Sequence, residues 1–190
     1  TQKVKGNMNR LNETGRTVEI VAVPDFGMIT FKGNLSDQKV RLGIKKLTGC
    51  EVPGITKISS KNGIAVAWMS YDELAIILKR DLVERMIDRL SQRMKNIHHL
   101  CVEVSDSRTC FQLKGKSWRE VLAKGTPADV SPACFKQGDF RRSRLGNIAV
   151  AFWTTEDEVV NLICFRSVGM FMRDWLSNAS SNNSLPRIFT

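Results

Sequence analysis

The sequence is poor in residues and motifs that carry chemistry: it has one tyrosine and two histidines in 190 residues. It contains no Cys-x-x-Cys pair, no Gly-x-Ser-x-Gly motif, and neither a Gly-x-Gly-x-x-Gly nor a P-loop phosphate motif. These absences argue against a zinc knuckle, a serine nucleophile elbow and a Rossmann-type dinucleotide site. No run approaches the roughly 20 apolar residues of a transmembrane helix, so none is predicted.

The composition is that of a folded protein. Hydrophobic residues make up 42% and charged residues 25% of the chain, which excludes intrinsic disorder and suits one domain, or two small ones sharing a core. Residues 1–16 are polar, with no apolar stretch that could serve as a signal peptide, so we expect a cytoplasmic location.

Cysteines and basic residues are both scattered. The odd number of cysteines, five, favours buried free thiols over a disulfide framework. The net charge of +10 is spread in small clusters without a basic tail. Such a charge admits either nucleic acid or a large acidic protein as partner. The cysteines are Cys50, Cys101, Cys110, Cys134 and Cys164.

The most informative feature is an internal repeat. The Ile-Ala-Val-Ala sequence at residues 64–67 recurs 84 residues later at 148–151. Downstream, Arg80 and Leu90 are followed 86 residues later by Arg166 and Leu176. Upstream, Phe-Lys-Gly at 31–33 resembles Leu-Lys-Gly 82 residues later. We interpret this as a module of about 85 residues present twice, which is too long and too rarely repeated for a solenoid.

Each copy predicts two strands, a helix, three strands and a helix. In the first copy, strands are expected at residues 17–23, 28–32, 55–59, 64–69 and 73–78. Its first helix is expected to begin after an N-cap at Ser36 and to end at Thr48-Gly49. Its second is expected at residues 82–94, behind a D-x-x-E capping pattern formed by Asp81 and Glu84.

The second copy follows the same pattern. Strands are expected at residues 100–105, 109–113, 141–145, 148–153 and 158–164. Its first helix is expected between a Ser117-x-x-Glu120 capping box and Gly125, and its last shows an apolar stripe over residues 168–176 with Ser167 as N-cap. The predicted organisation is a polar arm at 1–16, subdomains at 17–99 and 100–176, and a tail at 177–190.

No residues show the spacing of a catalytic or metal site. His98 and His99 have no third ligand at a recognisable spacing and are expected near the C-terminus of the long helix. Asp129 is expected to cap the turn around Pro132 rather than to act as a general base. We predict no catalytic, cofactor-binding or metal-binding residue in this chain.

The C-terminal tail is the candidate interface. A Ser/Asn-rich stretch at 177–184 precedes the apolar residues Leu185, Ile188 and Phe189, which we expect to dock onto a partner. The alternative is that the tail folds back onto its own sheet. The predicted charged rim consists of Arg141, Arg142, Arg144 and Arg187.

Several segments of the second copy, taken in order, carry a family likeness. They are Ala-Lys-Gly-Thr-Pro-Ala-Asp-Val at 123–130, Phe135, Gly138, Arg-Leu-Gly-Asn-Ile-Ala-Val at 144–150, Arg166-Ser167 and Trp175-Leu176. This succession resembles the gamma subunit family of heterotetrameric sarcosine oxidase. The likeness is sharpest from residue 117 to 176 and covers most of the chain.

The resemblance implies an α+β fold related to the folate-binding part of glycine-cleavage aminomethyltransferase. That fold is a duplication of β2-α-β3-α subdomains that exchange their first strands, with antiparallel or mixed sheets and helices packed on one face. It also implies a non-catalytic structural subunit, whose partners are alpha, beta and delta subunits, chiefly the aminomethyltransferase-like end of alpha.

The resemblance further implies a reaction for the whole complex. Sarcosine is oxidised to glycine and the one-carbon unit passes to tetrahydrofolate, with FAD, FMN, NAD and zinc held by other subunits and no cofactor by this chain. Two alternatives remain open from the sequence: a stand-alone folate-dependent one-carbon protein, and a basic RNA-binding module, although nucleic acid is the less favoured partner.

Overall fold

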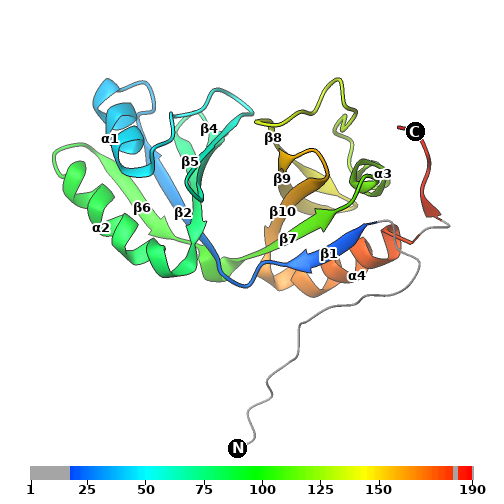
Figure 1. Cartoon of the computed structure of the whole chain (residues 1–190). Helices are drawn as coiled ribbons and strands as arrows, with labels where there is room; N and C mark the ends of the chain where they lie inside the picture. The colour runs from blue at the N-terminus through cyan, green and yellow to red at the C-terminus, as the bar shows by residue number, and fades with distance from the viewer. Residues whose placement is uncertain (1–17, 182–183, 190) are drawn as a thin grey trace, which may run out of the picture.

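Two five-stranded antiparallel sheets organise the part of the chain that the computed structural model describes, residues 18–181 and 184–189 (Figure 1). In spatial order, the first sheet comprises β3 (Ile58–Lys61), β4 (Ile64–Ser70), β5 (Glu73–Lys79), β2 (Phe26–Gly33) and β6 (His99–Glu103). The second comprises β8 (Phe140–Leu145), β9 (Ile148–Glu156), β10 (Val159–Phe165), β7 (Arg108–Lys114) and β1 (Glu19–Ala22).

The α-helices pack on one face of each sheet. On the first sheet lie α1 (Gln38–Thr48) and α2 (Val83–Arg93), and on the second lie α3 (Trp118–Ala123) and α4 (Gly169–Ala179). Three short 3₁₀ turns connect elements: η1 (Arg80–Leu82), η2 (Ser105–Ser107) and η3 (Arg166–Val168). None of the helices in the described part of the chain is long and apolar enough to cross a membrane.

The two halves exchange their first strands. β1 leaves the first half and pairs with β7, with Glu19 opposite Lys114, while β6 pairs with β2, with His99 opposite Gly33. Figure 1 shows β1 beside β7 and β6 beside β2. The repeated segments in β4 and β9 occupy the same position in their sheets, next to the outermost strand, so the predicted duplication is confirmed. β6 spans the predicted subdomain boundary between residues 99 and 100.

The core has three parts. One apolar cluster fills the space between each sheet and its helices, and a third lies between the two sheets. The third cluster contains Met28 and Met69 from the first half and Phe140 and Trp153 from the second. Because successive strand residues point to opposite faces, β2, β4, β5, β7, β8, β9 and β10 each contribute both to the core of their own half and to the cluster between the sheets.

In each half, a strand and the start of a helix approach so closely that one of the two carries a glycine. A Cβ on Gly27 would lie 2.6 Å from Val83 Cγ2, and a Cβ on Gly169 would lie 2.9 Å from Thr109 Oγ1. By the repeat offsets, Gly27 corresponds to Thr109 and Val83 to Gly169. Each half therefore pairs one glycine with one β-branched residue, but the two have exchanged positions.

Helix starts differ from the sequence predictions. Asp37, not Ser36, caps α1, because its Oδ1 accepts a hydrogen bond from Lys39 N at 2.8 Å. The capping pattern predicted for α2 and the Ser167 cap of the last helix are wrong, because Leu82 and Val168 occupy these positions. Ser117 is the N-cap of α3 as predicted, but its side chain makes no capping hydrogen bond. A 3₁₀ turn leads directly into both α2 and α4.

The boundaries of the predicted apolar faces also need correction. Leu82 is 39% exposed and Phe171 is 59% exposed, whereas Met172 and Leu176 are buried as expected. The predicted end of α1 is confirmed, because Gly49 adopts a left-handed conformation with φ 75°. The predicted polar arm at residues 1–16 lies outside the described residues.

Candidate functional site

The three arginines of β8 differ in their contacts, and Arg142 connects the two halves. Arg142 donates from Nη1 to the carbonyl oxygen of Met69 in β4 at 2.6 Å. Arg141, the preceding residue of the strand, lies on the opposite face and donates to the carbonyl oxygen of Cys134 at 3.0 Å. Arg144 is exposed and makes no hydrogen bond or ion pair with the described residues. Of these three predicted rim residues, Arg144 is thus the one that no internal contact engages.

The C-terminal tail folds back onto its own half, which is the alternative that the sequence left open. Leu185 and Phe189 lie half-buried against the helix-side core of the second half. The Glu120 carboxylate accepts hydrogen bonds from Ile188 N at 3.0 Å and Phe189 N at 2.6 Å. Two of the three apolar tail residues are thus packed against the second half, whereas Ile188 is 64% exposed and Arg187 is exposed. Docking of the tail onto a partner stays a prediction.

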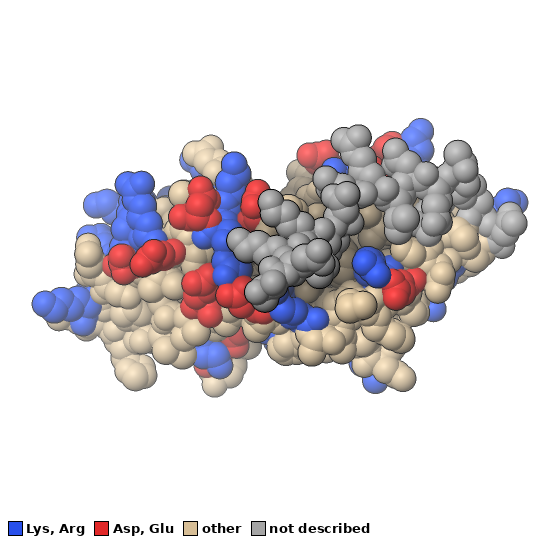
Figure 2. Space-filling model, turned by 90° about the horizontal axis from the view of Figure 1, so that it is seen from below, with Lys and Arg blue, Asp and Glu red and all other residues tan. Residues whose placement is uncertain are grey.

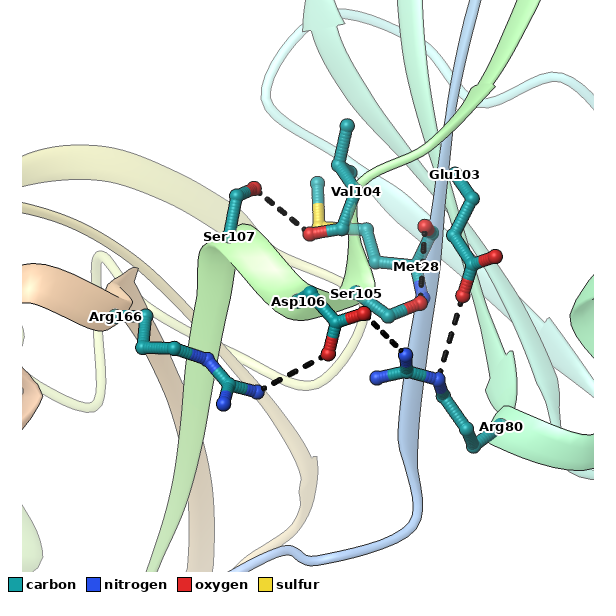
Figure 3. A network of polar contacts seen from close by, with 8 residues as sticks. All are labelled: Met28, Arg80, Glu103, Val104, Ser105, Asp106, Ser107 and Arg166. Carbon is teal, nitrogen blue, oxygen red and sulfur yellow. Dashed lines mark hydrogen bonds and ion pairs between the residues drawn. The ribbon is translucent and has the colours of Figure 1, made fainter.

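An ionic network lies where the two halves cross (Figure 3). Arg80 Nη2 lies 2.7 Å from Asp106 Oδ2, and Arg166 Nη2 lies 3.5 Å from Asp106 Oδ1. Arg80 Nε also lies 3.3 Å from Glu103 Oε1. The two arginines are repeat counterparts at the starts of η1 and η3, so a single carboxylate from η2 is shared between equivalent positions of both halves.

The network shifts the ionisation of its members. The hydrogen bond from Arg80, together with the charges of Arg80 and Arg166, lowers the pKa of Asp106. The same hydrogen bond raises the pKa of Arg80. Because the Asp106 side chain is 77% exposed, water and salt screen the attraction, and the network orients the halves more than it stabilises them.

A cleft of about 410 Å³ opens beside this network. Its walls include Pro24, which lies between β1 and β2, Phe26 at the start of β2 and Met170 at the start of α4. Three arginines also line it: Arg80, Arg108 and Arg166. The Arg108 guanidinium lies 3.8 Å from the centre of the Phe165 ring. Burial lowers the pKa of Arg108.

The cleft is lined by arginines and apolar side chains. Among its lining residues, Ser105 accepts a hydrogen bond at Oγ from Met28 N at 3.0 Å, which is a structural contact. Burial raises the pKa of the Cys110 thiol, so it is not a thiolate nucleophile near neutral pH. Among the described residues that line the cleft, none is a histidine or a carboxylate that could act as a general base.

The cysteines differ in burial. All five cysteines are free, and three are buried, but Cys134 is exposed, so the prediction of burial is wrong there. Burial raises the pKa of Cys101 and Cys164 to about 11. In the described part of the chain, no group of three or more His, Cys, Asp or Glu residues could hold a metal ion.

His98 and His99 lie beyond the end of α2 rather than at its C-terminus. α2 ends at Arg93, and His99 begins β6. The His99 ring stacks on Phe31 with ring centres 5.9 Å apart, and its Nδ1 lies 2.8 Å from the carbonyl oxygen of Ile97. Asp129 Oδ1 accepts from Ser131 N at 2.8 Å, which is the turn contact expected from the sequence.

Exposed apolar side chains gather at the start of α4. Phe165 is 49%, Met170 75% and Phe171 59% exposed. Their repeat counterparts in the first half are all charged: Lys79, Glu84 and Arg85. Figure 2 shows the same contrast, with charges gathered over the first half and the centre and a mostly uncharged surface on the described part of the second half. Since the fold is shared, the fold alone does not require this patch.

Comparisons with known proteins agree with this architecture. In the solved structure of heterotetrameric sarcosine oxidase from Corynebacterium sp. U-96 in complex with pyrrole 2-carboxylate, one chain superposes with a TM-score of 0.82 at 22% identity, covering 93% of this chain and 90% of that one. The glycine cleavage aminomethyltransferase T from Bartonella henselae gives a TM-score of 0.60 at 9% identity, over 86% of this chain and 46% of that one. The protein is thus an α+β protein with the aminomethyltransferase-like fold.

The sequence comparisons narrow this class to one family. The family model described as sarcosine oxidase, gamma subunit family, matches residues 32–182, and the chain belongs to that family. A curated relative, sarcosine oxidase subunit gamma from Corynebacterium sp. (strain U-96), is 26% identical over 127 residues, or 67% of this chain. The chain spans 61% of the length of that relative.

Proposed function

We propose that this chain is a structural, non-catalytic subunit of a heterotetrameric sarcosine-oxidase-type complex. Membership of the gamma subunit family carries the proposal. The complex oxidatively demethylates sarcosine to glycine and passes the one-carbon unit to tetrahydrofolate. FAD, FMN, NAD, zinc and tetrahydrofolate are bound by the other subunits, and the complex works in the cytoplasm.

The apolar patch at the start of α4 supports a role in assembly. Phe165, Met170 and Phe171 expose large side chains, Met170 lines the cleft, and such patches mark contact surfaces with other proteins. Aromatic residues and methionine are enriched in the cores of such interfaces. The partner that we propose for this surface is the aminomethyltransferase-like end of the alpha subunit.

Co-expression with the other three subunits tests the proposal. We expect this chain to co-purify with them and the complex to oxidise sarcosine, while the isolated chain shows neither flavin absorbance nor turnover. Replacing Met170 and Phe171 by glutamate introduces charge into the patch and should weaken co-purification by about tenfold or more. The counterparts Glu84 and Arg85 provide the control: Glu84→Lys with Arg85→Glu should leave yield unchanged.

Two results would contradict the proposal. If the wild-type chain were recovered without the other subunits after co-expression, it would not be a structural subunit of the complex. Sarcosine turnover by the isolated chain would show that it is not a non-catalytic subunit.

A further inference from the structure

The groove between α1 and α2 is a second feature that the fold alone does not explain. Two adjoining cavities of about 370 and 340 Å³ follow it and share Gln92 and Arg93. Figure 1 shows the two helices next to each other on the outer side of the first half, away from the second. The residues that define this α1–α2 groove are Lys39, Leu42, Arg89, Arg93, Lys95 and Ile97.

The α1–α2 groove is positively charged without internal compensation. Its four cations are exposed, and within residues 18–181 and 184–189 their side chains make no ion pair or hydrogen bond. No aspartate or glutamate lines either cavity. Leu42, which lines the same cavity as Lys39, Arg93 and Lys95, is 58% exposed. The groove therefore presents cations around an apolar contact point.

In the second half, the C-terminal tail covers the equivalent groove. In the second half, the equivalent helices are α3 and α4, and the C-terminal tail lies against both. Lys124 Nζ donates to Ser184 Oγ and to the carbonyl oxygen of Ala179, each at 2.5 Å. By the repeat offsets, Lys124 corresponds to Leu42 and Ala179 to Arg93. The tail thus covers the positions that line the open groove of the first half.

The tail is held by two kinds of contact. Leu185 and Phe189 pack on the apolar core, and the backbone N–H groups of Ile188 and Phe189 are bound by Glu120. In the first half the chain continues from α2 into β6, so no terminal segment follows α2 to cover its groove. The first groove must be covered by another chain or stay open.

We propose that the α1–α2 groove binds an extended, acidic segment of a partner polypeptide, much as the tail covers the groove of the second half. The four cations would pair with carboxylates of the segment, and Leu42 and Ile97 would contact its apolar side chains. The proposal rests on the proposed function, because it takes the partner to be another subunit of the complex.

Other occupants fit the charges less well. Residues 1–17 carry four basic residues and one acidic residue, so like charge opposes their binding there. A second copy of this chain carries a net charge of +10. Single-stranded nucleic acid is bound through aromatic side chains on which bases stack, and no aromatic residue lines the groove.

Charge reversal on the intact chain tests the groove directly. The probe is a short fluorescent peptide of alternating glutamate and leucine, and binding is followed by anisotropy at low salt. Arg89→Glu with Arg93→Glu should weaken binding by about tenfold or more. Lys39→Glu with Lys95→Glu should do the same from the other side. Circular dichroism checks that each variant folds.

A matched control uses exposed lysines outside the groove. Lys114→Glu with Lys116→Glu changes the net charge equally, lies in the second half, and should change binding by less than about twofold. Equal losses in groove and control variants, or no binding by the wild type, would overturn the proposal. So would tighter binding of an RNA oligonucleotide that competes with the peptide.

Co-purification with the other subunits separates this proposal from the proposed function. Loss of assembly in the groove variants and not in the control supports both. Full assembly of all variants overturns the groove as a subunit contact and leaves the proposed function standing. Failure of the wild-type chain to assemble overturns the proposed function, and the peptide titration then decides whether the groove binds acidic segments.

Discussion

Among the glycines in the described part of the chain, Gly27 is the one whose added Cβ would make the shortest contact. A Cβ there would meet not only Val83 Cγ2 but also the backbone, at 3.0 Å from both Arg80 Cα and Leu78 O. Backbone atoms cannot move aside as a flexible side chain can, so Gly27→Ala should destabilise the protein by about 1–3 kcal/mol. Urea unfolding followed by circular dichroism measures the change.

The control for this substitution is Gly54→Ala. A Cβ on Gly54 would have no heavy atom within 4 Å, so its stability should change by less than about 0.5 kcal/mol. If both variants unfolded at the same urea concentration, the close packing inferred at Gly27 would be wrong. Gly169→Ala is expected to cost less than Gly27→Ala, because its nearest neighbour is a side-chain hydroxyl, Thr109 Oγ1, at 2.9 Å.

Contacts of single residues are the hardest feature to predict from the sequence. The repeat correctly pairs Arg80 with Arg166, but nothing local indicates that Asp106 lies between them, because three separate 3₁₀ turns must meet first. Glu120 shows the same limit. Its position three residues after Ser117 predicts a capping box, yet its carboxylate binds a backbone 68 residues away. A local pattern cannot show which distant donor competes for the same side chain.

Elements are predictable wherever periodicity is clear. Strand and helix order follows from alternation and helical spacing, and the Ile-Ala-Val-Ala repeat by itself identifies β4 and β9 as equivalent strands. The exchange of β1 and β6 between halves follows from the family resemblance instead. Strand periodicity shows which residues share a face, but it does not determine which strand is the neighbour.

At the scale of elements, the tail should stabilise the second half. Truncation after Ser181 removes the N–H donors of residues 188 and 189 and leaves the carboxylate of Glu120, which is 3% exposed, without these partners. We expect a loss of about 2 kcal/mol or more, since truncation removes two hydrogen bonds to a charged acceptor and the apolar contacts of Leu185 and Phe189 with the core. Urea unfolding of the truncated and intact chains measures it.

A substitution at Glu120 separates the effect of its hydrogen bonds to the tail from the effect of losing the other tail contacts. Glu120→Ala should destabilise the intact chain but should cost much less in the truncated chain, because the carboxylate there has already lost the tail. The coupling between the two changes should reach about 1 kcal/mol. Strictly additive effects would show that the tail contacts at Glu120 carry no stability.

At the scale of the whole molecule, backbone and ionic contacts connect the halves. Phe140 N donates to Thr56 O at 2.8 Å, and Ile58 N donates to Gly138 O at 3.0 Å. Beside them Lys57 Nζ lies 2.5 Å from Asp139 Oδ1. Although burial acts to raise the pKa of Asp139, the hydrogen bonds from Lys57 and Lys136 N lower it overall. This link is therefore present above the ordinary pKa of an aspartate and is lost as the pH falls through the lowered value.

Strand exchange makes the folding unit differ from the repeat unit. All five strands of the first sheet lie within residues 26–103, although the sequence repeat divides the chain near residue 99. A fragment of residues 26–103 should therefore form the first sheet with α1 and α2. A fragment of residues 18–98 should not, because β2 lacks its neighbour β6 and β1 lacks its partner β7. Helical circular dichroism and urea unfolding of the two fragments measure the difference.

Complementation provides the decisive comparison. Mixing residues 18–98 with residues 99–190 supplies both missing strands, so the mixture should recover the helical signal and a cooperative transition that neither fragment shows alone. The side chains at the junction between the sheets, such as Met28 and Phe140, are buried only when both halves are present. Independent, cooperative unfolding of residues 18–98 with the stability of residues 26–103 would show that β6 is dispensable and that strand exchange does not hold the two halves in one folding unit.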